Sequence, residues 1–289
     1  MKIIKYFFEA IIIYIFFVII KLIGLNNGRR LFSYIFIKIG PLVKSKKVVE
    51  ENIYRVFENN IDNKKVIAEM WSNYGKVFVE YIFLKKFKNN SSKSKFVNIK
   101  NLKILDEIIK SKKPVIFISG HFANFELMSM ELVKKQINLA TIYRPLNNIF
   151  LNPLMEYLRK KFICKNQIKK GISGTRECIN YLNNNYSVAL MVDQRVSEGK
   201  RLPFFKHGAL TTTLPAQLAL KYKFDIVPIY ISRNNDDSFE MEFYDPIKTS
   251  EKESSKKNKI DISLKINEII QQMILRNPGQ WIWTHNRWK

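Results

Sequence analysis

The chain has 289 residues, 46% of them hydrophobic, with 49 lysines and arginines against 25 aspartates and glutamates. This length excludes a peptide-sized scaffold and allows one large α/β domain or two small ones. Two cysteines and three histidines exclude a disulfide framework and a cysteine-based zinc site, and a reducing, cytoplasm-facing location is the simplest interpretation. The formal charge of +24 favours an anionic partner, without choosing between nucleic acid, acidic lipid headgroups and an acidic protein.

The amino-terminal residues predict a membrane segment. Ala10 to Ile20 is uncharged and apolar, and Ile3 to Leu25 reaches the roughly 20 residues that cross a bilayer if Glu9 and Lys21 lie near the headgroups. A single span and a monotopic anchor both fit this pattern. A cleaved signal peptide is a competing interpretation, but no A-x-A-like cleavage site follows. A buried core helix is the remaining alternative.

A helical region follows the membrane segment. From Lys64 to Phe87 the apolar residues recur at three- and four-residue steps, which predicts a helix with one buried stripe. Lys88 to Lys95 is short and polar and is predicted to be a loop.

Strands and helices then alternate to the end of the chain, which favours an α/β layer structure. Strands are predicted at 114–119, 139–143, 187–192, 225–231 and 239–243, and helices at 124–135, 153–162, 174–183, 214–222 and 260–275.

The segment from Pro114 to Met128 carries the candidate chemistry. An apolar strand ends at Gly120, His121 follows at once, and Glu126 lies five positions further on. The imidazole is therefore expected at the carboxyl end of a strand, where open α/β sheets hold their sites. Asn124 is the expected N-cap of the next helix, which places Glu126 in the first turn, where it is predicted to fix the tautomer of the imidazole.

Such a pair suits general-base catalysis. A neutral imidazole can take a hydroxyl proton while the oxygen attacks a thioester, and a carboxylate stabilises the imidazolium that forms. A core histidine beside a capping acid produces the same spacing, so the pair alone does not settle the function.

The stretch from His121 to Glu126 resembles the HX4D/E signature of glycerolipid and lipid A acyltransferases. Further segments resemble, in order, the late lauroyl/myristoyl acyltransferases of lipid A biosynthesis, and the resemblance covers nearly the whole chain. These segments are Ile142-Tyr-Arg-Pro145, Met191-Val-Asp-Gln194, Leu202-Pro-Phe-Phe205 with Leu210-Thr-Thr-Thr-Leu-Pro-Ala216, Ile226-Val-Pro-Ile-Tyr-Ile-Ser-Arg233, and Pro278-Gly-Gln-Trp-Ile-Trp-Thr-His-Asn-Arg-Trp288.

The resemblance implies a fold, a reaction and a location. The fold would be a mixed central sheet flanked by helices, divided into an amino-terminal membrane anchor (1–25), a helical region (26–98) and an acyltransferase core (99–289). The reaction would move a fatty acyl chain from an acyl carrier protein or coenzyme A thioester to a hydroxyl of an anionic lipid A precursor. It would take place at the inner membrane, with His121 as base and without a metal or redox cofactor. Beside the resemblance, we expect the cytoplasmic face and a monomer.

Other strand ends supply candidate substrate-binding residues. Arg144 and Arg233 each end a predicted strand and are expected to clamp a phosphate or the developing oxyanion, or to be ordinary solvated or salt-bridged arginines. Asp193 is expected to contact substrate or to pair structurally with a nearby Arg or Lys, and Asn124 completes the predicted substrate-binding set. His285 is predicted to be structural, because the resemblance assigns the base to the first motif.

The carboxyl-terminal tryptophans have two interpretations. Trp281 and Trp283 share one face of an extended segment and are expected to close the core, and an interfacial aromatic belt is the alternative.

Two alternatives to lipid A acylation are kept. Within the enzymes, the acceptor would be another membrane lipid, such as a mannosylated inositol phospholipid, an ornithine lipid or a lysophospholipid. Outside the enzymes, a membrane-tethered nucleic-acid-binding or scaffold protein would use the basic surface. Because the basic residues are spread along the chain and form no known nucleic-acid-binding motif, no nucleic-acid partner is predicted.

Overall fold

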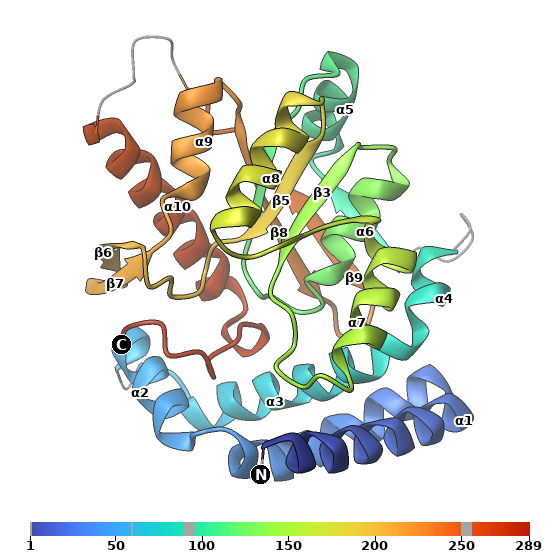
Figure 1. The fold of residues 1–289 in the computed structure, drawn as a ribbon. Helices are drawn as coiled ribbons and strands as arrows, with labels where there is room; N and C mark the ends of the chain where they lie inside the picture. Colours follow the sequence, from blue (N-terminus) through green and yellow to red (C-terminus); the bar gives the residue numbers. More distant parts are fainter. Residues whose placement is uncertain (1, 59, 90–95, 250–255) are drawn as a thin grey trace.

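A seven-stranded sheet forms the centre of the protein in a computed structural model that describes residues 2–58, 60–89, 96–249 and 256–289 (Figure 1). Its strands are β1 (Val97–Lys100), β2 (Ile116–Ser119), β3 (Leu139–Tyr143), β4 (Asn166–Lys169), β5 (Ser187–Met191), β8 (Ile226–Arg233) and β9 (Phe239–Phe243). They lie in the order β1-β9-β8-β2-β5-β3-β4. All neighbours are parallel except β8 and β9. The expected mixed α/β sheet is confirmed.

Helices flank the sheet and form a separate layer at one end of the molecule. They are α1 (Lys2–Val43), α2 (Lys46–Phe57), α3 (Asn63–Glu80), α4 (Leu84–Lys88), α5 (Leu102–Ser111), α6 (Glu126–Lys134), α7 (Asn152–Leu158), α8 (Ile172–Asn183), α9 (Leu214–Tyr222) and α10 (Lys256–Arg276). Short helical turns η1 (Tyr81–Phe83), η2 (Arg159–Ile163) and η3 (Pro278–Gln280) and a hairpin of β6 (Lys200–Phe204) and β7 (His207–Thr211) complete the described elements.

The predicted helices and strands of the core are all present, with shifted ends in several cases. The single helix expected from 64 to 87 is divided, because η1 interrupts it after α3. Most of the loop expected at 88–95 lies outside the described residues. The sequence did not predict β1, β4, α2, α5 or the β6–β7 hairpin. The division at residues 25 and 98 stays a prediction.

Helix α1 folds back on itself at Gly24. This residue has φ 81° and ψ 174°, a conformation that glycine adopts more readily than residues with a side chain. In a straight helix Phe16 and Phe32 would be about 24 Å apart, yet their ring centroids lie 5.4 Å apart. The helix therefore consists of a first arm, residues 2–23, and a second arm, residues 25–43, which run side by side beneath α3 (Figure 1).

The register of β2 and β5 brings two distant residues together. These strands are parallel neighbours, and Ser119 lies opposite Met191. His121 and Asp193 each come two positions later and therefore leave the sheet at the same edge. The same holds for β3 and β4, where the last paired residues are followed directly by Arg144 and Lys170. Open α/β sheets bind their ligands at this edge.

The carboxyl-terminal tryptophans belong to the core. Trp281 and Trp283 are buried, with ring centroids 4.7 Å apart, which confirms the core interpretation over an interfacial belt. Arg287 is fully buried and donates to the carbonyl of Leu210 at 2.7 Å and to Thr211 Oγ1 at 2.8 Å. Burial lowers the pKa of Arg287 to about 10. This segment ties the end of the chain to the β6–β7 hairpin.

Candidate active site

His121 and Asp193 form the centre of the candidate site. The Nδ1 atom of His121 lies 2.8 Å from Oδ1 of Asp193. The other carboxylate oxygen accepts from the backbone N–H of His121 at 2.9 Å and from the indole N–H of Trp281 at 2.8 Å. A carboxylate held in this way accepts the Nδ1 proton, which leaves Nε2 of the imidazole unprotonated and able to act as a base.

Asp193 stays ionised although it is buried. Burial by itself raises the pKa of this carboxyl group, but attraction to His121 and the hydrogen bonds from His121 and Trp281 outweigh that effect and lower the pKa to about 2. Its side chain is 1% exposed, whereas that of His121 is 20% exposed. The expected contact between Asp193 and substrate is therefore wrong, because the carboxylate lies behind the imidazole.

Glu126 does not hold His121, and this part of the prediction is wrong. The chain turns through Ala123, whose φ is 43°, between the two residues. Glu126 does begin α6, but its Oε1 accepts from Arg159 Nε at 2.8 Å and from the hydroxyl of Tyr81. Burial alone would lower the pKa of Arg159, but the Glu126 carboxylate outweighs it and raises that pKa. Glu126 thus positions a cation on η2, a π-helical turn of a kind frequent at functional sites.

Arg233 and Asn124 are buried away from the site, contrary to their predicted roles. β8 continues beyond its last pairing with β2, at Pro228, so Arg233 reaches α3 rather than the region around His121. Its Nη2 donates to Glu80 Oε2 at 3.0 Å, and Asn124 Nδ2 donates to the same oxygen at 2.8 Å. Asn124 is not the N-cap of α6, a position that Phe125 occupies.

Glu80 joins this cluster to the second arm of α1. It is fully buried, and Arg29 donates to it through Nε at 2.8 Å. Replacing Glu80 with Gln should lower the free energy of unfolding by about 3–5 kcal/mol, because it leaves two buried guanidinium groups without their carboxylate. Chemical denaturation measures the loss. The matched control is Glu240→Gln, whose carboxylate pairs outside this cluster with Lys100, a side chain that is 50% exposed, and this should cost less than about 1 kcal/mol.

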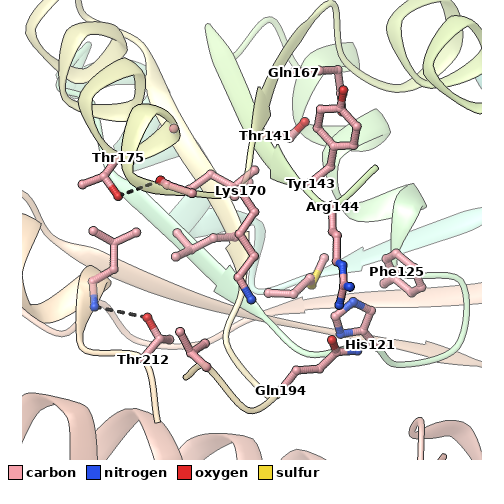
Figure 2. Close-up of a pocket in the computed structure, with 18 of the residues that line it drawn as sticks. His121, Phe125, Thr141, Tyr143, Arg144, Gln167, Lys170, Thr175, Gln194 and Thr212 are labelled. Carbon is pink, nitrogen blue, oxygen red and sulfur yellow. Dashed lines mark hydrogen bonds between the residues drawn. The ribbon is translucent and has the colours of Figure 1, made fainter. Parts of the chain in front are cut away.

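A cavity of about 740 Å³ opens in front of His121. Figure 2 shows the guanidinium of Arg144 beside the imidazole and the ammonium of Lys170 reaching toward the same space. Arg159 and Arg195 also line the cavity, and these cations outnumber the two carboxylates in the wall, Glu126 and Glu198, so the wall is basic on balance. Apolar side chains from β5, α6 and α9 line it as well, including Met128, Leu190 and Leu214. The cavity suits a ligand with an anionic group and an apolar chain. Among the predicted binding residues, Arg144 is the one that lines this cavity.

The comparison with known proteins decides the family. The whole chain, residues 1–289, matches the family of bacterial lipid A biosynthesis acyltransferases. The chain belongs to this family. It is similar to a lipid A biosynthesis palmitoleoyltransferase of Escherichia coli (strain K12) and to a lipid A biosynthesis acyltransferase of Shigella flexneri. Each is 24% identical over 256 residues, which cover 86% of this chain and 80% of the relative. The resemblance found in the motifs is confirmed, and the protein is an acyltransferase.

The motifs of this lipid A acyltransferase divide into two groups in space. Arg144, Gln194, Thr212 and Thr213 line the cavity together with His121. Arg233, at the end of another motif, instead helps to hold the helical layer on the sheet.

His285 is a cavity residue that the sequence analysis took to be structural. Its ring lines the acyltransferase cavity, and its Nδ1 is buried without a hydrogen-bond partner among the described residues. The side-chain amide of Asn52 fixes the backbone around His285, because it donates to the carbonyls of Trp283 and His285, both at 2.8 Å. Burial lowers the pKa of His285 to about 4, and nearby His121, Arg287 and Lys170 add to the shift while Asp193 opposes it. The sequence signal that could have identified His285 as a cavity residue is its position in the last motif, two residues after the buried Trp283.

The lowered pKa of His285 predicts that the folded protein loses stability in acid. Between pH 6.5, the ordinary pKa of histidine, and pH 4, the unfolded chain binds a proton at His285 that the folded acyltransferase does not. The stability that this residue contributes should therefore be present above pH 6.5 and fall as the pH drops toward 4. Denaturation midpoints measured at pH 7, 5.5 and 4.5 check this. His285→Gln should show a flatter dependence, and an unchanged dependence would contradict the assignment.

Proposed function

We propose that this protein transfers a fatty acyl chain from an acyl carrier protein or coenzyme A thioester to a hydroxyl of a lipid A precursor. The observation that carries the proposal is the imidazole of His121, which faces the cavity and is held by Asp193 in the tautomer that a general base needs. Membership of the lipid A acyltransferase family supplies the reaction class.

The reaction follows from the free nitrogen of His121. Nε2 takes the proton of the acceptor hydroxyl while the hydroxyl oxygen attacks the thioester carbonyl carbon. The tetrahedral intermediate then breaks its carbon–sulfur bond, and the imidazolium returns the proton to the leaving sulfur. An ester and a free thiol result, and Asp193 remains a carboxylate that stabilises the imidazolium.

This mechanism is a direct transfer without an acyl-enzyme on cysteine. Cys164 and Cys178 are buried, and burial raises their pKa values to about 11 and about 12. Neither thiol lines the cavity, and a thiol of such high pKa is a poor nucleophile at neutral pH. The proposed chemistry uses only the imidazole and its carboxylate, so we also propose that no metal or redox cofactor takes part.

The basic cavity wall supports anionic substrates. Arg144 stands beside His121 and suits a phosphate of the acceptor or the oxyanion of the intermediate (Figure 2). The net charge of +24 would attract both an acidic acyl carrier protein and an anionic glycolipid. We place the protein as a monomer at the cytoplasmic face of the inner membrane, held by α1, the one described helix that is long and apolar enough to cross a bilayer.

The test is a direct transfer assay. Purified protein, an acyl carrier protein thioester and a lipid A precursor should give an acylated glycolipid, detected by mass spectrometry. Coenzyme A thioesters in a parallel reaction identify the donor, and a lysophospholipid or a mannosylated inositol phospholipid identifies the acceptor. Absence of product with every donor and every acceptor would contradict the proposed substrates.

A further inference from the structure

The first arm of α1, residues 2–23, is attached to the protein along most of its length. Near its start, Asn148 Nδ2 donates to the carbonyl of Tyr6 at 2.8 Å. In its middle, the hydroxyl of Tyr14 donates to the carbonyl of Phe150 at 2.9 Å. Near its end, the ammonium of Lys21 lies 5.7 Å from the ring centroid of Phe83. From Tyr6 to Lys21 the attached stretch measures about 22 Å along the helix axis.

The opposite face of the arm is apolar and open. Six residues on it, which we name the apolar stripe, are between 38% and 81% exposed: Ile4, Phe8, Ile11, Ile15, Ile19 and Leu22. They follow one another at three- and four-residue steps and so share one side of the helix. Lys5 and Glu9 lie outside the stripe and pair with each other, and Glu9 also accepts from Asn148 on the attached side.

The attachment decides how the arm can lie in a membrane. If it crossed the bilayer, the loop that carries Asn148 and Phe150 would enter the hydrocarbon with it, along with part of the helical layer. Lipid-exposed loop backbone does not occur there, because its polar groups would lose their hydrogen-bond partners. The arm instead has one side packed on the protein and exposes apolar side chains on the other, with basic residues at the borders, and this one-sided exposure suits the membrane interface.

We propose that the first arm lies in the plane of the cytoplasmic leaflet, with the apolar stripe among the upper acyl chains, and does not cross the bilayer. The inference rests on the membrane location given under the proposed function. Lys5 and Lys21 are exposed beside the stripe, at the level of anionic headgroups.

The same surface leads to the cavity. The loop between β3 and α7 starts at Arg144, which lines the cavity, and continues to Phe150, whose ring packs on Phe7 of the first arm with centroids 5.5 Å apart. Leu146 and Ile149 on this loop are 39% and 56% exposed. An acceptor lipid can therefore keep its own acyl chains in the leaflet while its polar head reaches His121 past this loop.

Depth measurements test the proposal on the full-length protein. Ile4→Cys, Ile11→Cys and Leu22→Cys are labelled with an environment-sensitive fluorophore and reconstituted into vesicles of phosphatidylethanolamine and phosphatidylglycerol. Quenchers attached at different acyl-chain depths then locate each label. All three positions should lie at one shallow depth, about 5–10 Å below the headgroups. A crossing helix would place Ile11 deeper than Ile4 by up to about 10 Å.

Two controls show that the quenching comes from labels at the introduced cysteines and depends on their position in the protein. The native cysteines are buried, so the protein without added cysteine gives the labelling background. Leu102→Cys on α5, at the far end of the molecule from α1 (Figure 1), should not be quenched. A depth maximum at Ile11, or no quenching at any of the three positions, would overturn the proposal. Acyl transfer by the same labelled proteins in detergent shows separately whether the proposed reaction holds.

Discussion

Replacing His121 with Ala should lower kcat for acyl transfer by about 10²- to 10⁴-fold, the usual contribution of a positioned general base. The variant keeps the cavity but has no group that can take the hydroxyl proton as the oxygen attacks the thioester. The acceptor hydroxyl would then attack in its neutral form, with only bulk water to take the proton. Initial rates of product formation, measured by mass spectrometry with both substrates saturating, give the change in kcat.

His207 supplies the matched control for this experiment. His207 lies on the β6–β7 hairpin, where its ring contacts the carbonyl of Arg55 at 3.2 Å, and it does not line the cavity. His207→Ala should therefore keep the rate of the unaltered protein. Because His121 is a hydrogen-bond partner of the buried Asp193 carboxylate, its loss should lower the midpoint of thermal unfolding, so the rates are compared at a temperature where the variant is folded. An unaltered kcat in His121→Ala would remove the imidazole from the mechanism.

Strands were predictable from the sequence where burial dictates their residues, and not at the sheet edges. β2 is buried at every position, so its apolar run indicates a central strand. β4, at one edge, has a single buried residue, and β1, at the other, also has one. Such short polar segments carry no hydrophobic period, because only one side of each meets the core.

The β6–β7 hairpin was missed for a different reason. Its two turn residues, Phe205 and Lys206, have φ angles of 51° and 63°, values that Asn and Gly usually supply. Contacts from distant segments stabilise this turn. Trp288 Nε1 donates to the carbonyl of Phe204 at 3.0 Å, and the side chain of Gln271 accepts from the N–H of Phe205 at 2.7 Å. Local turn chemistry cannot reveal a turn that tertiary contacts hold.

The central pair of the candidate site was predictable in its residues but not in its pairing. His121 and Asp193 were both recognised at strand ends, yet the chemistry was assigned to the nearer acid, Glu126. Separation along the chain favours that choice, whereas the true partner follows from strand order, which places β5 next to β2. Strand order is a tertiary property that one sequence does not reveal. Arg233 was misplaced for a similar reason. β8 extends beyond the end of its pairing with β2 because it continues to pair with β9 as far as Arg233.

Asp193→Asn should be at least as damaging as the loss of His121, with a fall in kcat on the order of 10³- to 10⁴-fold, the scale found when a tautomer-fixing aspartate becomes an amide. Two donors, the backbone N–H of His121 and the indole of Trp281, point at Oδ2 of the carboxylate. The asparagine must therefore present its only carbonyl oxygen to them and turn its NH₂ group toward Nδ1 of His121. An imidazole that accepts at Nδ1 carries its proton on Nε2, where it can no longer take one from the acceptor.

Glu126→Gln distinguishes this arrangement from the pairing that chain spacing suggests. The glutamine keeps the size of a side chain that contacts Arg159 and Tyr81 and not His121, so kcat should fall far less than in Asp193→Asn. The two variants are compared under identical conditions, with thermal unfolding measured for both, because each removes a buried charge. The reverse order of the two rates would mean that Glu126 orients the base during turnover. Asp193 would then support the fold around His121 without setting its tautomer.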